Sequence, residues 1–274
     1  MKFAHAALIA SLWMGAAVAA VVPKTALHPT IVVEPNVQVQ RFYGFAHSLD
    51  SGKYLYTEVH ARQQQGTRWM GGSVTYFAPD GTKMGTKVLD FSAAGDVPLY
   101  RLELKNPRYS EGVSGVKAGE IYLFTQAPGD GAPHQATVSN RAQSAADVTG
   151  IERLIQQNFV ELERSGSMVF PLASARRLDE RRFSVTRLKD GQRKGVTLVR
   201  FKVELASPLR LFGGTPMFFS FDPATRQLVE YRGLSDVENP KTGDRYHVRI
   251  DYGTKPPADA PAKLPPLDAS TAKR

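Results

Sequence analysis

Apolar and polar side chains alternate along most of the chain, as they do in β-strands, where successive side chains point to opposite sides. In residues 53–62, small or apolar side chains occupy every second position, and tyrosines or charged residues fill most of the positions between them. One face carries Leu55, Thr57, Val59 and Ala61, and the other carries Tyr54, Tyr56, Glu58, His60 and Arg62. Similar patterns predict strands at residues 73–77, 83–91, 99–104, 120–126, 182–188, 195–205, 217–221, 227–233 and 244–252.

Turn residues separate these predicted strands. Pro79-Asp80-Gly81 and Asp222-Pro223 stand between apolar runs, and Pro, Asp and Gly each favour the backbone angles of tight turns. Short connections between strands are typical of antiparallel sheets. Residues 127–146 are rich in Gly, Ala, Pro and Ser and are expected to form a surface loop.

One segment has helical spacing instead. In residues 147–165 the apolar side chains recur every three or four positions, with Ile155 and Phe159 on the apolar face. Thr149 and Glu152 have the spacing of a capping box, and Gly166 can end the helix in the left-handed conformation. The sequence therefore predicts a mainly β (α+β) fold: a strongly bent antiparallel sheet, or half-barrel, with one covering helix near 148–165.

The two ends of the chain differ from this central part. Residues 1–20 combine a basic start, an apolar run and the small residues Ala16–Ala20, the pattern of a cleavable signal peptide. Residues 253–274 contain five prolines and few aromatic or β-branched residues, which predicts a disordered Pro-rich tail. The expected organisation is a signal peptide, a single β-rich domain over residues 21–252, and the tail.

Charge and cysteine content narrow the function classes. The chain has 35 basic and 26 acidic residues and a formal charge of +9. We expect an exported, periplasmic or secreted protein to meet envelope components rather than nucleic acid. The absence of cysteine excludes disulfide scaffolds, cysteine nucleophiles, Cys-ligated metal sites and a lipoprotein anchor.

Catalytic motifs are weak. Ser114–Lys117 has the S-x-x-K spacing of serine β-lactamases, but residues 112–119 contain three glycines and no helical pattern. Glu58 and His60 share one strand face and are weak metal-ligand candidates, although no third ligand can be named. We expect no cofactor and no catalytic site; a hydrolase using either pair is the weakest of the hypotheses.

Aromatic and aliphatic side chains concentrate in residues 201–221, around Gly213-Gly214. This concentration and the predicted helix give candidate ligand-binding residues that would line a cavity if they do not simply pack as core. These candidates are Phe201, Leu211, Phe212, Phe219, Phe221, Ile155 and Phe159.

Three segments, residues 54–60, 74–91 and 218–252, resemble an uncharacterised family of exported bacterial β-rich proteins. The bent sheet, the covering helix and the D-P-x-T-x-x-L hairpin at residues 222–228 are also similar in layout to the periplasmic lipoprotein-carrier superfamily, whose half-barrels hold acyl chains between sheet and helix. This similarity of layout implies a fold and offers only an analogy for function.

Two functions fit these features. The first is a non-enzymatic module that binds a lipid or another hydrophobic or amphipathic small molecule of the envelope. The alternative is a structural or interaction protein that meets an envelope protein and has no pocket. Whether the predicted helix covers a solid core or a cavity separates the two.

Overall fold

The computed structural model describes residues 36–91, 97–193, 195–206 and 214–270. The predicted signal peptide lies outside these residues. Within the described part of the chain, no helix is long and apolar enough to cross a membrane.

The described residues form one 15-stranded sheet whose order is β8-β7-β6-β5-β4-β3-β2-β1-β15-β14-β13-β12-β11-β10-β9. Neighbouring strands are antiparallel except for β9 and β10, which are parallel. The strands are β1 (Gln38–Ser48), β2 (Tyr54–Gln65), β3 (Arg68–Phe77), β4 (Lys83–Asp90), β5 (Leu99–Lys105), β6 (Arg108–Lys117), β7 (Glu120–Gln126), β8 (His134–Ser139), β9 (Ala145–Ala146), β10 (Ser167–Ser174), β11 (Asp179–Arg193), β12 (Val196–Leu205), β13 (Met217–Phe221), β14 (Leu228–Glu238) and β15 (Arg245–Gly253).

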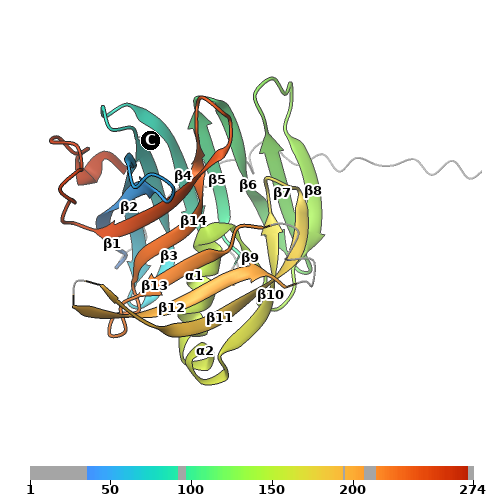
Figure 1. Cartoon of the computed structure of the whole chain (residues 1–274). Coiled ribbons are helices and arrows are strands. Elements are labelled where there is room, and N and C mark those ends of the chain that lie inside the picture. The colour runs from blue at the N-terminus through green and yellow to red at the C-terminus, as the bar shows by residue number, and fades with distance from the viewer. Residues whose placement is uncertain (1–35, 92–96, 194, 207–213, 271–274) are drawn as a thin grey trace, which may run out of the picture.

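The sheet has two halves, and the pairing of β1 with β15 joins them. β1–β8 extend from this junction in one direction and β15–β9 in the other. The sheet curls so that the halves face each other, and α1 (Asp147–Gln157) lies between them (Figure 1). The prediction of a mainly β fold built on a strongly bent antiparallel sheet is confirmed.

Glycines allow the strands of the first half to approach each other closely. A side chain at Gly112 of β6 would lie 2.0 Å from the carbonyl oxygen of Tyr100 on β5, and one at Gly85 of β4 would lie 2.4 Å from that of Glu103. Neither position has room for a Cβ atom. The same glycines weaken the strand pattern in the sequence, and β6 was not predicted.

The predicted helix forms in two pieces. α1 is followed by α2 (Phe159–Ser165), with Asn158 between them, and Gly166 ends α2 at a φ of 80°, as predicted. The capping box does not form: α1 begins at Asp147, and Glu152 binds an arginine of the sheet instead of the helix N-terminus.

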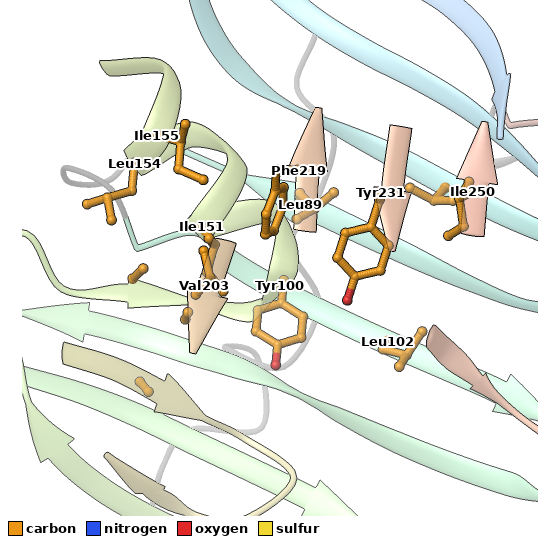
Figure 2. Packing of buried hydrophobic residues seen from close by; sticks show 14 of the residues in the cluster. Leu89, Tyr100, Leu102, Ile151, Leu154, Ile155, Val203, Phe219, Tyr231 and Ile250 are labelled. Carbon is orange, nitrogen blue, oxygen red and sulfur yellow. The ribbon is translucent and has the colours of Figure 1, made fainter. Parts of the chain in front are cut away.

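The main core lies between α1, α2 and the inner face of the sheet. Ile151, Leu154 and Ile155 of α1 are at most 1% exposed and belong to one cluster with side chains of both halves. Figure 2 shows these helix residues among core side chains of the sheet, including Tyr100 of β5 and Phe219 of β13.

The C-terminal segment corrects the prediction of a disordered tail. Residues 254–270 run along the outside of β1–β3 and end in a short 3₁₀ helix, η3 (Leu267–Ser270). Residues 271–274 lie outside the described part. Leu264 and Leu267 pack against an outer apolar cluster of Tyr43, Phe45 and Val59.

Two polar contacts fix this segment to β1. The Tyr43 hydroxyl donates to the carbonyl oxygen of Pro265 at 2.9 Å, and His47 Nε2 lies 3.1 Å from Asp259 Oδ2. Prolines restrict the unfolded chain and so lower the entropy lost when such a segment becomes ordered. The apolar outer face of β1 and β2 supplies the contact surface that the composition of the segment alone did not reveal.

We expect Leu267→Asp to release residues 254–270 from the sheet, because it places a charge against the Tyr43–Phe45–Val59 cluster. The loss of stability should be small, about 1 kcal/mol, since Leu267 is only half-buried. Limited proteolysis and amide hydrogen exchange should show faster cleavage and exchange in this segment. Ala262→Asp, at an exposed position of the same segment, is the control; equal protection in the two variants would contradict the assignment.

Candidate functional site

A cavity of about 450 Å³ lies against the inner face of the sheet near the β1–β15 junction. Strands β1–β4, β14 and β15 form most of its wall, and Val148, Thr149 and Glu152 of α1 border it from the other side. The sequence left open whether the helix covers a solid core or a cavity. In the structure its apolar face packs on the core and its first turns border the cavity.

Strand β2 supplies the polar side of the cavity. Glu58, His60 and Arg62 line it, whereas Val59 packs on the outer face under the C-terminal segment. The two-faced pattern predicted for this strand is present, with the polar face inward. Tyr54 and Leu55 are the exceptions, because a bulge opposite Ala46/His47 shifts the register. It places Tyr54 with the outer cluster and Leu55 with the main core.

Glu58 and His60 bind each other. His60 Nε2 lies 2.8 Å from Glu58 Oε2, and the His60 ring stacks on Phe42 with centroids 4.6 Å apart. The ring of Tyr252 meets His60 edge-on at 5.5 Å. A Cβ atom at Gly44 would lie 2.6 Å from Glu58 Oε2, so a glycine at this position leaves the space that the carboxylate occupies.

The weak metal-ligand candidates are thus brought together, but as a hydrogen-bonded pair. In the described ranges there is no group of three or more His, Cys, Asp or Glu side chains that could hold a metal ion. A zinc site in a protein ordinarily takes three or four such ligands.

Arg62 and Glu152 join β2 to α1 across the cavity wall. Arg62 Nη2 lies 2.7 Å from Glu152 Oε1, and both side chains are about nine-tenths buried. The guanidinium also lies over the ring of Trp69, 3.9 Å from its centroid. This stacking and the ion pair hold Arg62 in one orientation.

An ion cluster, which we call the Lys87 cluster, borders the cavity through Lys87 and Asp236. It consists of Lys87 of β4, Asp147 of α1, Asp236 of β14 and Arg245 of β15. Lys87 Nζ lies 2.8 Å from Asp147 Oδ2 and 2.6 Å from Asp236 Oδ2. Arg245 Nη2 lies 3.5 Å from Asp236 Oδ1. Asp147 adopts a left-handed backbone with φ of 61°, which aspartate tolerates better than most residues.

The charges of this cluster stabilise each other. Burial would raise the pKa of Asp236, but Lys87 and Arg245 outweigh this effect and lower it to about 2. Burial would likewise lower the pKa of Lys87, and the two carboxylates reverse that shift and raise it. The carboxylates likewise raise the pKa of Arg245, so Lys87, Arg245 and Asp236 stay ionised across the neutral pH range.

Two tyrosines of the first half extend the cluster. The Tyr76 hydroxyl donates to Asp236 Oδ2 at 2.8 Å, and the Tyr56 hydroxyl lies 2.5 Å from Ser235 Oγ. Burial is the main reason why the pKa of each tyrosine is well above its ordinary value, so both stay neutral. These contacts tie β2 and β3 to β14 across the interior.

The aromatic residues predicted to bind ligand pack with one another in the core. Phe159 of α2 contacts Phe201 and Phe221 at 5.4 and 5.7 Å between ring centroids, and Phe219 stacks on Phe221. Ile155 joins the same cluster. None of these five residues lines the cavity described here. Leu211 and Phe212 lie outside the described residues, and the ligand-binding role of the whole set stays a prediction.

The S-x-x-K residues are on a strand. Ser114 and Lys117 belong to β6, where the Ser114 hydroxyl donates to the carbonyl oxygen of Tyr122 and the Lys117 ammonium lies over the Tyr122 ring. Both side chains thus contact Tyr122 of β7, and the helical geometry that the β-lactamase motif needs is not formed here.

Sequence reasoning missed most residues of the cavity. The inward row of β2 was visible as alternation, but nothing in the sequence said that its polar face is the inner one. Lys87, Asp147 and Asp236 are far apart along the chain, and ion pairs between distant residues leave no periodic signal. Glu152 was identified, with a capping role that the structure replaces.

Lys87→Met is expected to destabilise the protein by about 3–5 kcal/mol, because it leaves two buried carboxylates without Lys87 as their shared cation. Adding Asp236→Asn should restore part of that loss. Urea unfolding would measure both effects. Lys83→Met, at the exposed start of the same strand, is the matched control, and equal losses for Lys83→Met and Lys87→Met would contradict the role of the cluster.

Asp236 should also make stability depend on pH in acid. Its pKa is about 2 when folded and near the ordinary 3.8 when unfolded, so the unfolded state takes up a proton first as the pH falls. The free energy of unfolding should decline from about pH 4 towards pH 2. Asp236→Asn cannot titrate and should show a shallower decline in urea unfolding at stepped pH; an unchanged slope would count against the assigned pKa.

Comparisons with known proteins give little beyond this geometry. No protein-family model and no curated protein matches the chain. Among solved structures, the chain is similar to a β-barrel-like protein of the domain of unknown function DUF1849 from Brucella abortus, with 9% sequence identity and a TM-score of 0.45. The similarity covers 79% of this chain and 96% of that one. The resemblance in layout to lipoprotein carriers stays a prediction.

Proposed function

We propose that this protein is a non-enzymatic, exported binding module that holds an amphipathic small molecule in the cavity between β1–β4, β14–β15 and α1. The observation that carries the proposal is the lining of the cavity, in which apolar and aromatic side chains alternate with fixed polar groups. Small-molecule sites commonly have volumes of about 300–1,000 Å³ and this kind of lining, and the cavity of about 450 Å³ falls in that range.

The apolar part of the lining would contact the body of the ligand. Val74, Leu89 and Ile250 come from β3, β4 and β15, and the aromatic rings of Phe42 and Tyr252 lie beside them near His60. Aromatic rings offer large contact areas with few rotatable bonds, so they bind a ligand at a low entropic cost.

The polar part is rigid. Arg62 is held by Glu152 and Trp69, and Lys87 is held by two carboxylates. Side chains fixed in this way can orient a ligand without first having to become ordered. The reactive groups of the wall are occupied by partners within the protein, which favours non-covalent binding over catalysis.

Location in the periplasm or outside the cell is part of the proposal. It is supported by the signal-peptide pattern of residues 1–20 and by the absence of cysteine. In that compartment the ligand would be an envelope component or a molecule taken up from outside.

A fluorescence titration with prodan, an uncharged amphipathic naphthalene dye, tests the binding function. We expect saturable binding to the full chain, because the dye is small enough for the cavity and has an apolar body. Thr149→Trp places a large ring at the cavity wall and should weaken prodan binding at least tenfold.

Gln157→Trp, at an exposed position of the same helix, should bind prodan like the wild type. Circular dichroism and the thermal midpoint of each variant show whether it is folded. Absence of saturable binding to the wild type, or equal affinity in a folded Thr149→Trp variant, would refute the proposed function.

A further inference from the structure

The charges along the cavity wall cancel within the protein. Arg62 is paired with Glu152 at 2.7 Å, and both groups are about nine-tenths buried. In the Lys87 cluster, of which Lys87 and Asp236 line the cavity, two cations are matched by two carboxylates. Neither group leaves an excess charge for a ligand.

Glu58 and Asp222, the other two carboxylates that line the cavity beside Glu152 and Asp236, also have partners. Glu58 is held by the imidazole of His60 at 2.8 Å. Asp222, at the rim, accepts hydrogen bonds from the backbone N–H groups of Ala224 and Thr225 and from the Thr225 hydroxyl, so its carboxylate is used to hold the β13–β14 turn. Arg41 borders the cavity and its buried Nε has no hydrogen-bond partner, but strand alternation places this side chain on the outer face with Tyr43.

This balance decides which ligands are favourable. A charged ligand would lose its hydration on entering and could gain an opposite charge only by breaking a pair that is already buried. A hydroxyl or amide group loses less hydration and can share the remaining donors and acceptors of those same pairs. The apolar body gains the same free energy of burial whether the polar end is charged or neutral.

We infer that the cavity selects an electrically neutral amphipathic molecule, whose polar end carries hydroxyl or amide groups. The inference rests on the proposed binding function and adds the ligand's charge class. The polar end would contact the part of the wall that carries Arg62, Glu152, Glu58 and His60. The apolar body would contact Val74, Leu89 and Ile250.

Three competitors with the same ten-carbon chain separate the charge classes: decyl β-glucoside, which is neutral, decanoate and decyltrimethylammonium. Each competitor is titrated against prodan bound to the full chain, at concentrations below its critical micelle concentration. We expect decyl β-glucoside to compete at a concentration at least tenfold lower than either charged competitor. Equal or better competition by a charged one, or no competition by the glucoside while prodan still binds, would overturn the inference.

A single substitution should change this preference. Glu152→Gln removes the carboxylate that neutralises Arg62 but keeps the size of the side chain, so decanoate should gain at least fivefold relative to decyl β-glucoside. Glu163→Gln makes the same change at an exposed position of α2 and should leave the ratio as in the wild type. An unchanged ratio in a folded Glu152→Gln variant would contradict the charge balance.

The two proposals fail in different ways. If prodan does not bind the wild type, the binding function itself is wrong. If prodan binds and Thr149→Trp removes it, the function stands, and the order of the three competitors alone decides the charge class.

Discussion

The ion pairs of Lys87 with Asp147 and Asp236 join three parts of the protein that are distant in sequence. Lys87 comes from the first half of the sheet, Asp236 from the second half, and Asp147 from the start of the helix between them. A buried ammonium is costly unless it is paired, and each carboxylate has the same requirement. The halves must therefore curl towards each other and α1 must start at this position, which sets the shape of the cavity above the cluster.

The cavity follows from that constraint and from the inverted faces of β2. In an ordinary half-exposed sheet the apolar face is covered and the polar face meets water. Here the outer face of β2 contributes Val59 to an apolar cluster with Tyr43 and Phe45 of β1, and Leu264 and Leu267 pack against this cluster. The inner face of β2 carries Glu58, His60 and Arg62. The C-terminal segment thus frees the inner face from the task of forming core, and this part of the interior can hold polar groups.

The aromatic part of the core and the cavity lie in different parts of the interior. The aromatic cluster of Phe159, Phe201 and Phe221 fills the space beneath α2. The cavity lies at the other end of the helical segment, beside Thr149 and Glu152. Val74, Leu89 and Ile250 belong both to the main core cluster and to the cavity wall, so the two regions share these side chains.

The sequence by itself determined most of the local structure, although residues 127–146, expected to form a surface loop, contain β8 and β9. Period-two alternation, Pro/Asp/Gly turns and one helical stretch were sufficient for a bent antiparallel sheet with a helix against it, because these patterns depend on near neighbours. Strand β6 was not predicted, because its glycines interrupt the strand pattern. The close approach of β5 leaves no room for a Cβ atom at Gly112. The tertiary structure alone decided which face of β2 points inward, that the C-terminal segment is ordered, and that Lys87, Asp147 and Asp236 meet. Those outcomes depend on contacts between residues far apart in the chain, which no local pattern encodes.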